Sequence, residues 1–256
     1  MITFTIENQI GKIILNRPEK FNSFNRQMSL ALQDALRKCE TNDNIRAVHL
    51  SASGKAFSAG QDLSEAMSPD GPGIEKIVAE HYNPIILGIR YLEKPVVCSV
   101  NGVAAGAGAN IALACDIVVA GKSSSFLQAF SKIGLVPDSG GTFFLPRLIG
   151  FQRATALMML GDKIGAEEAL RMGMIYKVFN DDELENESWK IASMLSEMPT
   201  KGLGLTKRLL NKSLYNSLEE QLKEEGKAQT AAGSTLDFKE GVQAFLEKRK
   251  AVFSGK

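Results

Sequence analysis

The chain of 256 residues is poor in the residue types that mark several common protein classes. Its three cysteines, Cys39, Cys98 and Cys115, are an odd number without metal-ligand spacing, which argues against a disulfide framework and favours reduced thiols in a cytoplasmic protein. The 30 basic and 29 acidic residues leave a formal charge of +1, so the balance indicates neither a nucleic-acid partner nor an anionic membrane surface. The sequence has no apolar run of spanning length and no signal-peptide pattern. These absences leave a small-molecule substrate as the expected class.

Motifs for metals and nucleotides are also missing. The chain has only 2 histidines, and neither His49 nor His81 has a carboxylate or a cysteine at ligand spacing, so we expect no metal. The segments 121–123 and 106–108 begin to match phosphate-binding loops, but each motif lacks a glycine that it needs. We therefore expect no nucleotide cofactor.

What the sequence does contain is a repeated pattern of strand, glycine-bearing turn and helix. The alternation over 2–6 and 10–15 predicts a strand hairpin, and Asn25 is expected to cap a helix with its apolar residues on one face. The pattern then recurs over 47–63 and 96–113. Such serial units predict a stacked α/β core.

Two further stretches are expected to be helical. A helix is predicted around 74–92, behind a polar segment rich in proline and glycine, and charged helices are predicted from about Asp182 onward. The length of the chain fits one large domain with this helical tail as an appended element. Helices of such tails often pack between subunits.

The stretch most informative for function is NGVAAGAGANIALACD at 101–116, followed by GLVPDSGG at 134–141. Small side chains let backbone N–H groups approach a ligand, and the start of a helix adds its positive dipole end, as an oxyanion hole requires. Close packing of a helix on a sheet explains the same small residues. Asp138 is either a proton-transfer group among apolar neighbours or the cap of a helix ending near Ile149, and composition alone favours the cap.

Several segments together resemble the crotonase (enoyl-CoA hydratase/isomerase) superfamily over essentially the whole chain. They are NRPEKFNSF at 16–24, GKAFSAGQDL at 54–63, KPVVCSVNGVAAGAG at 94–108, GLVPDSGGT at 134–142 and EGVQAFLEKRK at 240–250. The resemblance implies an α/β fold in which ββα units form a spiral, with a C-terminal helical region that trimerises. It implies a catalytic core over 1–195 and an oligomerising region over 196–256, as a homotrimer or a dimer of trimers.

The resemblance also implies an acyl-CoA thioester as substrate, with coenzyme A as part of that substrate and no separate cofactor. The thioester oxygen would be held by the backbone N–H groups of Gln61 and Ala107. Removal of one such donor typically costs on the order of 10²–10³ in rate. Further contacts to the substrate or to coenzyme A are implied for Ala59, Asp62, Leu63, Lys20, Phe245 and Lys248.

Side chains then select the reaction. Hydratases of the family use two glutamates, and their positions here hold Asn110 and Phe130, which cannot perform that acid–base work. The histidine of the dehalogenase branch has Asn83 nearest its place. The carboxylate of Asp138 instead matches isomerases that move a 3,4 double bond to the 2,3 position or convert the ring 1,2-epoxide of phenylacetyl-CoA to oxepin-CoA. We expect such an isomerase; the alternatives are an enoyl-CoA hydratase and a non-catalytic acyl-CoA-binding member.

Overall fold

The computed structural model describes residues 1–256. The strands are β1 (Ile2–Glu7), β2 (Ile10–Leu15), β3 (Ala47–Ala52), β4 (Ala56–Ser58), β5 (Val96–Val100), β6 (Val103–Ala105), β7 (Ile117–Gly121), β8 (Ser125–Leu127), β9 (Lys163–Gly165) and β10 (Lys177–Phe179). The α-helices are α1 (Arg26–Thr41), α2 (Leu63–Ala66), α3 (Gly73–Lys76), α4 (Asn83–Tyr91), α5 (Ala107–Leu113), α6 (Gly141–Ile149), α7 (Phe151–Leu160), α8 (Ala166–Arg171), α9 (Leu184–Ser196), α10 (Thr200–Lys212), α11 (Leu218–Gly233) and α12 (Leu236–Leu246). The other helical segments are η1 (Pro18–Lys20), η2 (Ile77–Tyr82) and η3 (Ala129–Ile133).

The N-terminal elements form as the residue pattern predicts. Strands β1 and β2 pair antiparallel around Asn8 and Gln9, whose φ angles of 49° and 65° suit a tight hairpin turn. The side chain of Asn25 accepts a hydrogen bond from the N–H of Met28 and caps α1. Both the hairpin and the capped helix are therefore confirmed.

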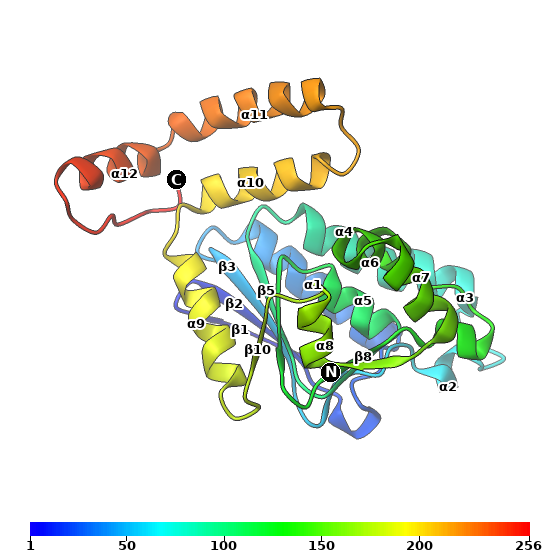
Figure 1. Cartoon of the computed structure of the whole chain (residues 1–256). Coiled ribbons are helices and arrows are strands. Elements are labelled where there is room, and N and C mark those ends of the chain that lie inside the picture. The colour runs from blue at the N-terminus through cyan, green and yellow to red at the C-terminus, as the bar shows by residue number, and fades with distance from the viewer.

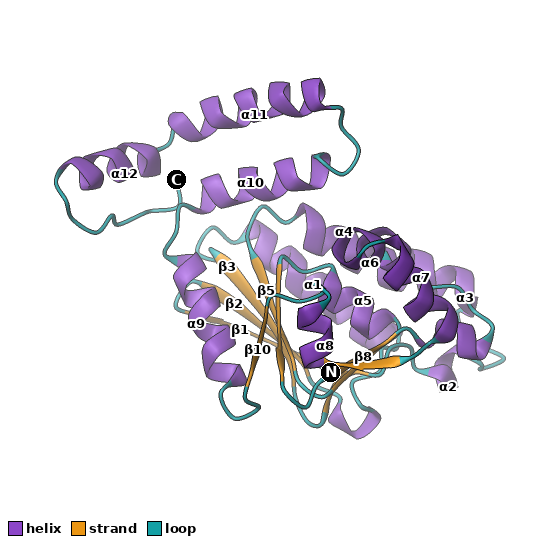
Figure 2. Ribbon diagram, in the orientation of Figure 1, coloured by secondary structure: helices purple, strands orange, loops and turns teal.

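Two sheets run through the body of the molecule, one of six strands in the order β1-β2-β3-β5-β7-β10 and one of four in the order β4-β6-β8-β9. Three successive units each give their first strand to the large sheet and their second to the small one, namely β3 with β4, β5 with β6, and β7 with β8. The strands from β2 to β10 in the large sheet are parallel. This arrangement is the predicted spiral of ββα units (Figures 1 and 2).

Helices cover both faces of the large sheet. The main core of 40 buried residues includes apolar side chains from α1, α4 and α5. A smaller cluster forms where α9 lies on the opposite face, with Ala192 and Leu195 against Ala47 and Val97. His49 belongs to this region, because it is 1% exposed and lies 2.9 Å from the hydroxyl of Ser188. This histidine is therefore part of the packing between α9 and the sheet.

The helix expected around 74–92 is present, but its turns are not uniform. Between α3 and α4 the segment η2 is a π-helix, and Pro84 follows it in the first turn of α4. Proline donates no backbone hydrogen bond, and its ring collides with the carbonyl four residues earlier in a regular α-helix. The wider turn of η2 avoids that collision, and π-helical turns are frequent at functional sites.

Helices α10, α11 and α12 extend away from the sheets as an arm (Figures 1 and 2). Its first helix is fixed to the core by Lys207, whose Nζ lies 2.7 Å from Oδ2 of Asp116 and 2.7 Å from the carbonyl oxygen of Ile89. The predicted boundary between 195 and 196 falls at the end of α9, before this arm. That the arm mediates trimer contacts stays a prediction. None of the helices combines the length and apolarity that a membrane crossing needs.

Candidate active site

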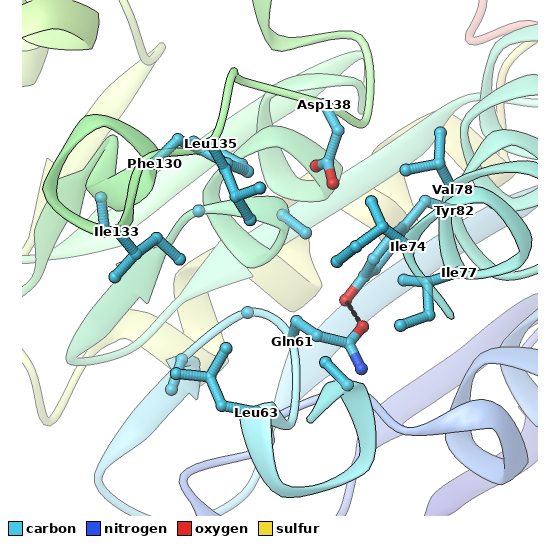
Figure 3. A pocket seen from close by; sticks show the side chains of 16 residues that line it. Gln61, Leu63, Ile74, Ile77, Val78, Tyr82, Phe130, Ile133, Leu135 and Asp138 are labelled. Atoms are coloured by element: carbon cyan, nitrogen blue, oxygen red, sulfur yellow. Dashed lines mark hydrogen bonds between the residues drawn. The ribbon is translucent and has the colours of Figure 1, made fainter. Parts of the chain in front are cut away.

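A largely apolar cavity of about 770 Å³, including its open mouth, lies where the spiral, η2 and η3 meet. Twelve of its 16 lining residues are hydrophobic, and Asp138 is the one carboxylic acid among them (Figure 3). The lining residues are Ala59, Gly60, Gln61, Leu63, Ala66, Ile74, Ile77, Val78, Tyr82, Gly106, Ala107, Ala129, Phe130, Ile133, Leu135 and Asp138.

Gln61 and Ala107 bring two backbone N–H groups to this cavity. Ala107 is the first residue of α5, so its N–H has no acceptor within the helix. Neither N–H donates to a turn, loop or side-chain acceptor. Their segments lie in backbone contact, because a Cβ on Gly60 would stand 2.8 Å from the Ala105 oxygen and 3.5 Å from the Ala107 nitrogen. The structure therefore places two N–H groups without these acceptors on neighbouring segments of the cavity wall.

The small residues of the 101–116 run also serve close packing. A Cβ on Gly108 would stand only 2.6 Å from Cβ and 2.8 Å from the carbonyl oxygen of Ser58, so α5 lies directly on β4. Ser58 in turn accepts a hydrogen bond from the N–H of Gly60 through its hydroxyl, at 3.1 Å. The packing interpretation of the run is therefore correct for Gly108, and that packing also sets the position of Ala107 beside it.

Asp138 points into the cavity and is not a helix cap (Figure 3). The N-cap of α6 is Gly140, and no side chain caps that helix, so the interpretation of Asp138 as a cap is wrong. Burial raises the pKa of the Asp138 carboxyl, against the opposing effect of a 2.9 Å hydrogen bond from the Ser139 hydroxyl. A carboxyl with a raised pKa both accepts and returns a proton more readily near neutral pH.

The two positions of the hydratase glutamates hold no acid and play different parts. Phe130 lines the cavity, with its ring near Gly106. Asn110 is buried beside the cavity, where its Nδ2 donates to the carbonyl oxygen of Asp138 at 2.9 Å. No pattern in the sequence indicates this contact. The same holds for Tyr82, whose hydroxyl donates to Oε1 of Gln61 at 2.7 Å (Figure 3).

The remaining predicted contact residues divide into two groups. Ala59 and Leu63 line the cavity, whereas Asp62 lies beside it, caps α2 and forms an ion pair with Arg17 at 2.7 Å. Burial alone would raise the pKa of Asp62, but hydrogen bonds from Ser64 and Arg17 bring it below its usual value. Asp62 thus fixes the loop that carries Gln61.

Three residues predicted to contact coenzyme A lie away from the cavity within this single chain. Lys20 is in η1, Phe245 is on α12 with 82% of its surface exposed, and Lys248 follows α12. None of them lines the cavity, and neither does Asn83 at the start of α4. Their contacts to coenzyme A stay predictions.

Comparisons with known proteins agree over the full length. The family described as "Enoyl-CoA hydratase/isomerase" matches residues 5–256. The "1,2-epoxyphenylacetyl-CoA isomerase" of Escherichia coli (strain K12) is 45% identical over 254 residues, which are 98% of this chain and 97% of that protein. A Rhodobacter capsulatus protein named "Probable enoyl-CoA hydratase" is 42% identical over 100% of this chain and 98% of its own. The crystal structure of an enoyl-CoA hydratase from Bacillus anthracis superposes with a TM-score of 0.93 at 31% identity, covering 100% of this chain and 99% of that one.

Proposed function

Since this chain belongs to the enoyl-CoA hydratase/isomerase family, we propose that it is an acyl-CoA isomerase in which Asp138 is the proton-transfer group. The observation that carries the proposal is the composition of the cavity. Asp138 is its one carboxylic acid, and it lies in the same apolar space as the free N–H groups of Gln61 and Ala107.

The proposed reaction moves one proton and leaves the composition of the substrate unchanged. With the thioester oxygen between the N–H groups of Gln61 and Ala107, the carboxylate of Asp138 removes a proton from the carbon next to the carbonyl. The electron pair of that C–H bond then delocalises onto the thioester oxygen as an enolate, which the two donors stabilise. For a 3-enoyl thioester, Asp138 returns the proton to carbon 4, and the double bond moves to the 2,3 position.

Hydration fits this cavity less well, because addition of water to a 2-enoyl thioester needs one group to activate water and one to deliver a proton. The hydratase positions supply an amide at Asn110 and a phenyl ring at Phe130. Phe130 is 7% exposed and lines the cavity, so this position presents an apolar ring instead of a carboxylate. We therefore propose isomerisation as the main reaction.

For the preferred substrate we propose the ring 1,2-epoxide of phenylacetyl-CoA. The epoxide opens to an oxepin by movement of ring electron pairs, and a proton shift from the side-chain carbon to the ring then conjugates the new double bond with the thioester. This second step is the same one-base proton shift as for a 3-enoyl thioester. The wide apolar cavity and the 45% identity to the Escherichia coli isomerase support this substrate.

The test measures conversion of a 3-enoyl-CoA to its 2-enoyl isomer by the wild type and by Asp138→Asn, with hydrated product followed in the same samples. A positioned base contributes roughly 10²–10⁴ in rate, so the variant should lose at least that factor of ~10² in kcat. Asp43→Asn, the same substitution at an exposed carboxylate in the turn after α1, is the matched control and should retain wild-type kcat.

Substrate carrying deuterium at carbon 2 adds a second readout, because a single shuttling base returns part of the label to carbon 4. Full isomerase activity in Asp138→Asn would overturn the proposal. Dominant hydration that survives the variant would show that another base acts, and the protein would then be a hydratase.

A further inference from the structure

The buried side chain of Asn110 joins three parts of the site. It lies on α5 one turn after Ala107, and only 1% of its surface is exposed. Its Nδ2 donates to the carbonyl oxygen of Asp138 at 2.9 Å, and its Oδ1 accepts from Nε2 of Gln128 at 2.8 Å. Gln128 is 5% exposed and precedes η3, which supplies Phe130 to the cavity wall.

The orientation of this amide is determined by its partners. A backbone carbonyl only accepts hydrogen bonds, so Asn110 must turn Nδ2 toward Asp138 and Oδ1 toward Gln128. Gln128 must then present its own Nε2, which leaves its buried Oε1 without a partner. Burial of this unpartnered oxygen is a desolvation cost, and the arrangement that causes it keeps Asn110 as a donor to Asp138.

The loop that carries Asp138 has few other attachments. Leu135 and Val136 are 41% and 79% exposed, and Ser139 and Gly140 have φ angles of 51° and 72°. The carbonyl oxygen of Asp138 receives the N–H of Gly141 at 2.9 Å in addition to Asn110. Gly141 rests on the same amide, since a Cβ there would stand 2.4 Å from Nδ2 of Asn110.

We propose that Asn110 is a positioning residue, which holds the carboxylate of Asp138 at a fixed place relative to the N–H of Ala107, with Gln128 fixing the orientation of Asn110. The proposal rests on the proposed function of Asp138. The N–H of Ala107 and the side-chain amide of Asn110 both belong to α5, so any motion of this helix moves them together. The distance between the N–H of Ala107 and the carboxylate of Asp138 is thereby kept.

A proton shuttle needs this accuracy more than a simple base does. Asp138 must reach the carbon next to the carbonyl and also the carbon that receives the proton, while the thioester oxygen stays on its two donors. A misplacement of about 1 Å costs roughly 10²-fold in rate. A carboxylate on a loosely held loop would spend much of its time out of reach of one of the two carbons.

The test compares Asn110→Ala and Asn110→Leu with the wild type in the isomerase assay. Both remove the donor to Asp138, and Asn110→Leu nearly keeps the side-chain volume. We expect kcat to fall at least tenfold in both variants while KM changes less than threefold, because the oxyanion donors and the coenzyme A contacts are untouched. Ser188→Ala, which removes a buried hydrogen bond to His49 beneath α9, is the control for a purely structural loss and should retain kcat.

Gln128→Met keeps the test decisive if substitutions at Asn110 prevent folding. It removes the donor that orients the Asn110 amide without touching the Asp138 loop, and we expect a threefold or larger fall in kcat at constant KM. In the Asp138→Asn background the same substitutions should change the residual kcat less than twofold. Folded variants with wild-type kcat, or with a rise in KM alone, would overturn the positioning role. Full activity of Asp138→Asn by itself would instead overturn the proposed function.

Discussion

Substitution of Gly108 by alanine tests how closely the proposed oxyanion donors, the N–H groups of Gln61 and Ala107, depend on the packing of α5 against β4. The added Cβ would stand 2.6 Å from Cβ, 2.7 Å from Oγ and 2.8 Å from the carbonyl oxygen of Ser58, whereas ordinary contact begins at 3.4 Å. The two elements must therefore separate by 0.6 to 0.8 Å, which is the difference between 3.4 Å and these distances. A backbone oxygen cannot turn away as a flexible side chain can.

The displacement reaches both donors. Ala107 precedes the substituted residue on α5, and the hydroxyl of Ser58 accepts the N–H of Gly60, the neighbour of Gln61. Overpacking of this kind costs about 1–3 kcal/mol of stability. Complete removal of an oxyanion donor costs on the order of 10²–10³ in rate, and a displaced donor loses part of that stabilisation. We expect Gly108→Ala to lower kcat by about 10²-fold, with a smaller effect on thermal stability.

The assay is the conversion of a 3-enoyl-CoA together with thermal unfolding of the same samples. Gly226→Ala is the matched control, because Gly226 lies within α11 and its added Cβ meets no atom within 4 Å. That control should keep wild-type kcat and gain up to about 1 kcal/mol of stability, since alanine is the better helix former. A Gly108→Ala protein with wild-type kcat would refute the argument that packing of α5 on Ser58 sets the donors.

Two further predictions concern stability. Burial raises the pKa of Asp138 in the folded protein above its ordinary value of 3.8, so the folded state binds the proton more tightly than the unfolded state. The resulting loss of stability grows as the pH rises from the ordinary pKa and is complete above the raised pKa. Asp138→Asn should therefore have a higher Tm than the wild type at pH 7, and the difference should vanish as the pH falls to about the ordinary carboxyl pKa; a lower Tm at pH 7 would contradict this. Lys207→Met leaves Asp116 without its 2.7 Å partner, at a cost of about 3–5 kcal/mol, which is roughly 6–20 °C in Tm for a chain of this size. A fall of less than about 3 °C in a thermal melt would show that Arg90, 3.3 Å from Asp116, is a sufficient partner.

The elements that the sequence predicted correctly are those with local physical causes. The hairpin over 2–15 follows from alternation and from a turn that Asn8 and Gln9 permit, and α1 follows from its apolar face and the Asn25 cap. The stacked α/β core follows from serial glycine-bearing turns, whereas its spiral arrangement was implied by the resemblance to a known family. The π-helical segment η2 was missed, because periodicity at 3.6 residues per turn does not distinguish one wide turn ahead of Pro84.

The site was predicted only in part, because some of its contacts have local sequence causes and others depend on tertiary packing. The placement of Asp138, Gln61 and Ala107 at one cavity agrees with their motifs, whereas composition wrongly favoured Asp138 as a helix cap. The turn formed by Ser139 and Gly140 carries the chain past the capping position before α6 begins. Asn110 and Asp138 are separated along the chain by strands β7 and β8, and tertiary packing brings them into contact. No local sequence pattern predicts this contact.

The parallel order of the large sheet also has a kinetic consequence. Only the β1–β2 pair is closed by a two-residue turn, while the pairs from β2 to β10 join strands that helices separate along the chain. Loop-closure entropy is lost before each of these non-local pairings forms, and folding of such topologies is slow. Until the last of these strands has paired, the partly formed sheet exposes unpaired strand edges, which can associate with other chains. The topology that sets two backbone donors side by side therefore makes this protein a slow folder, whose yield on refolding depends on keeping the chains dilute.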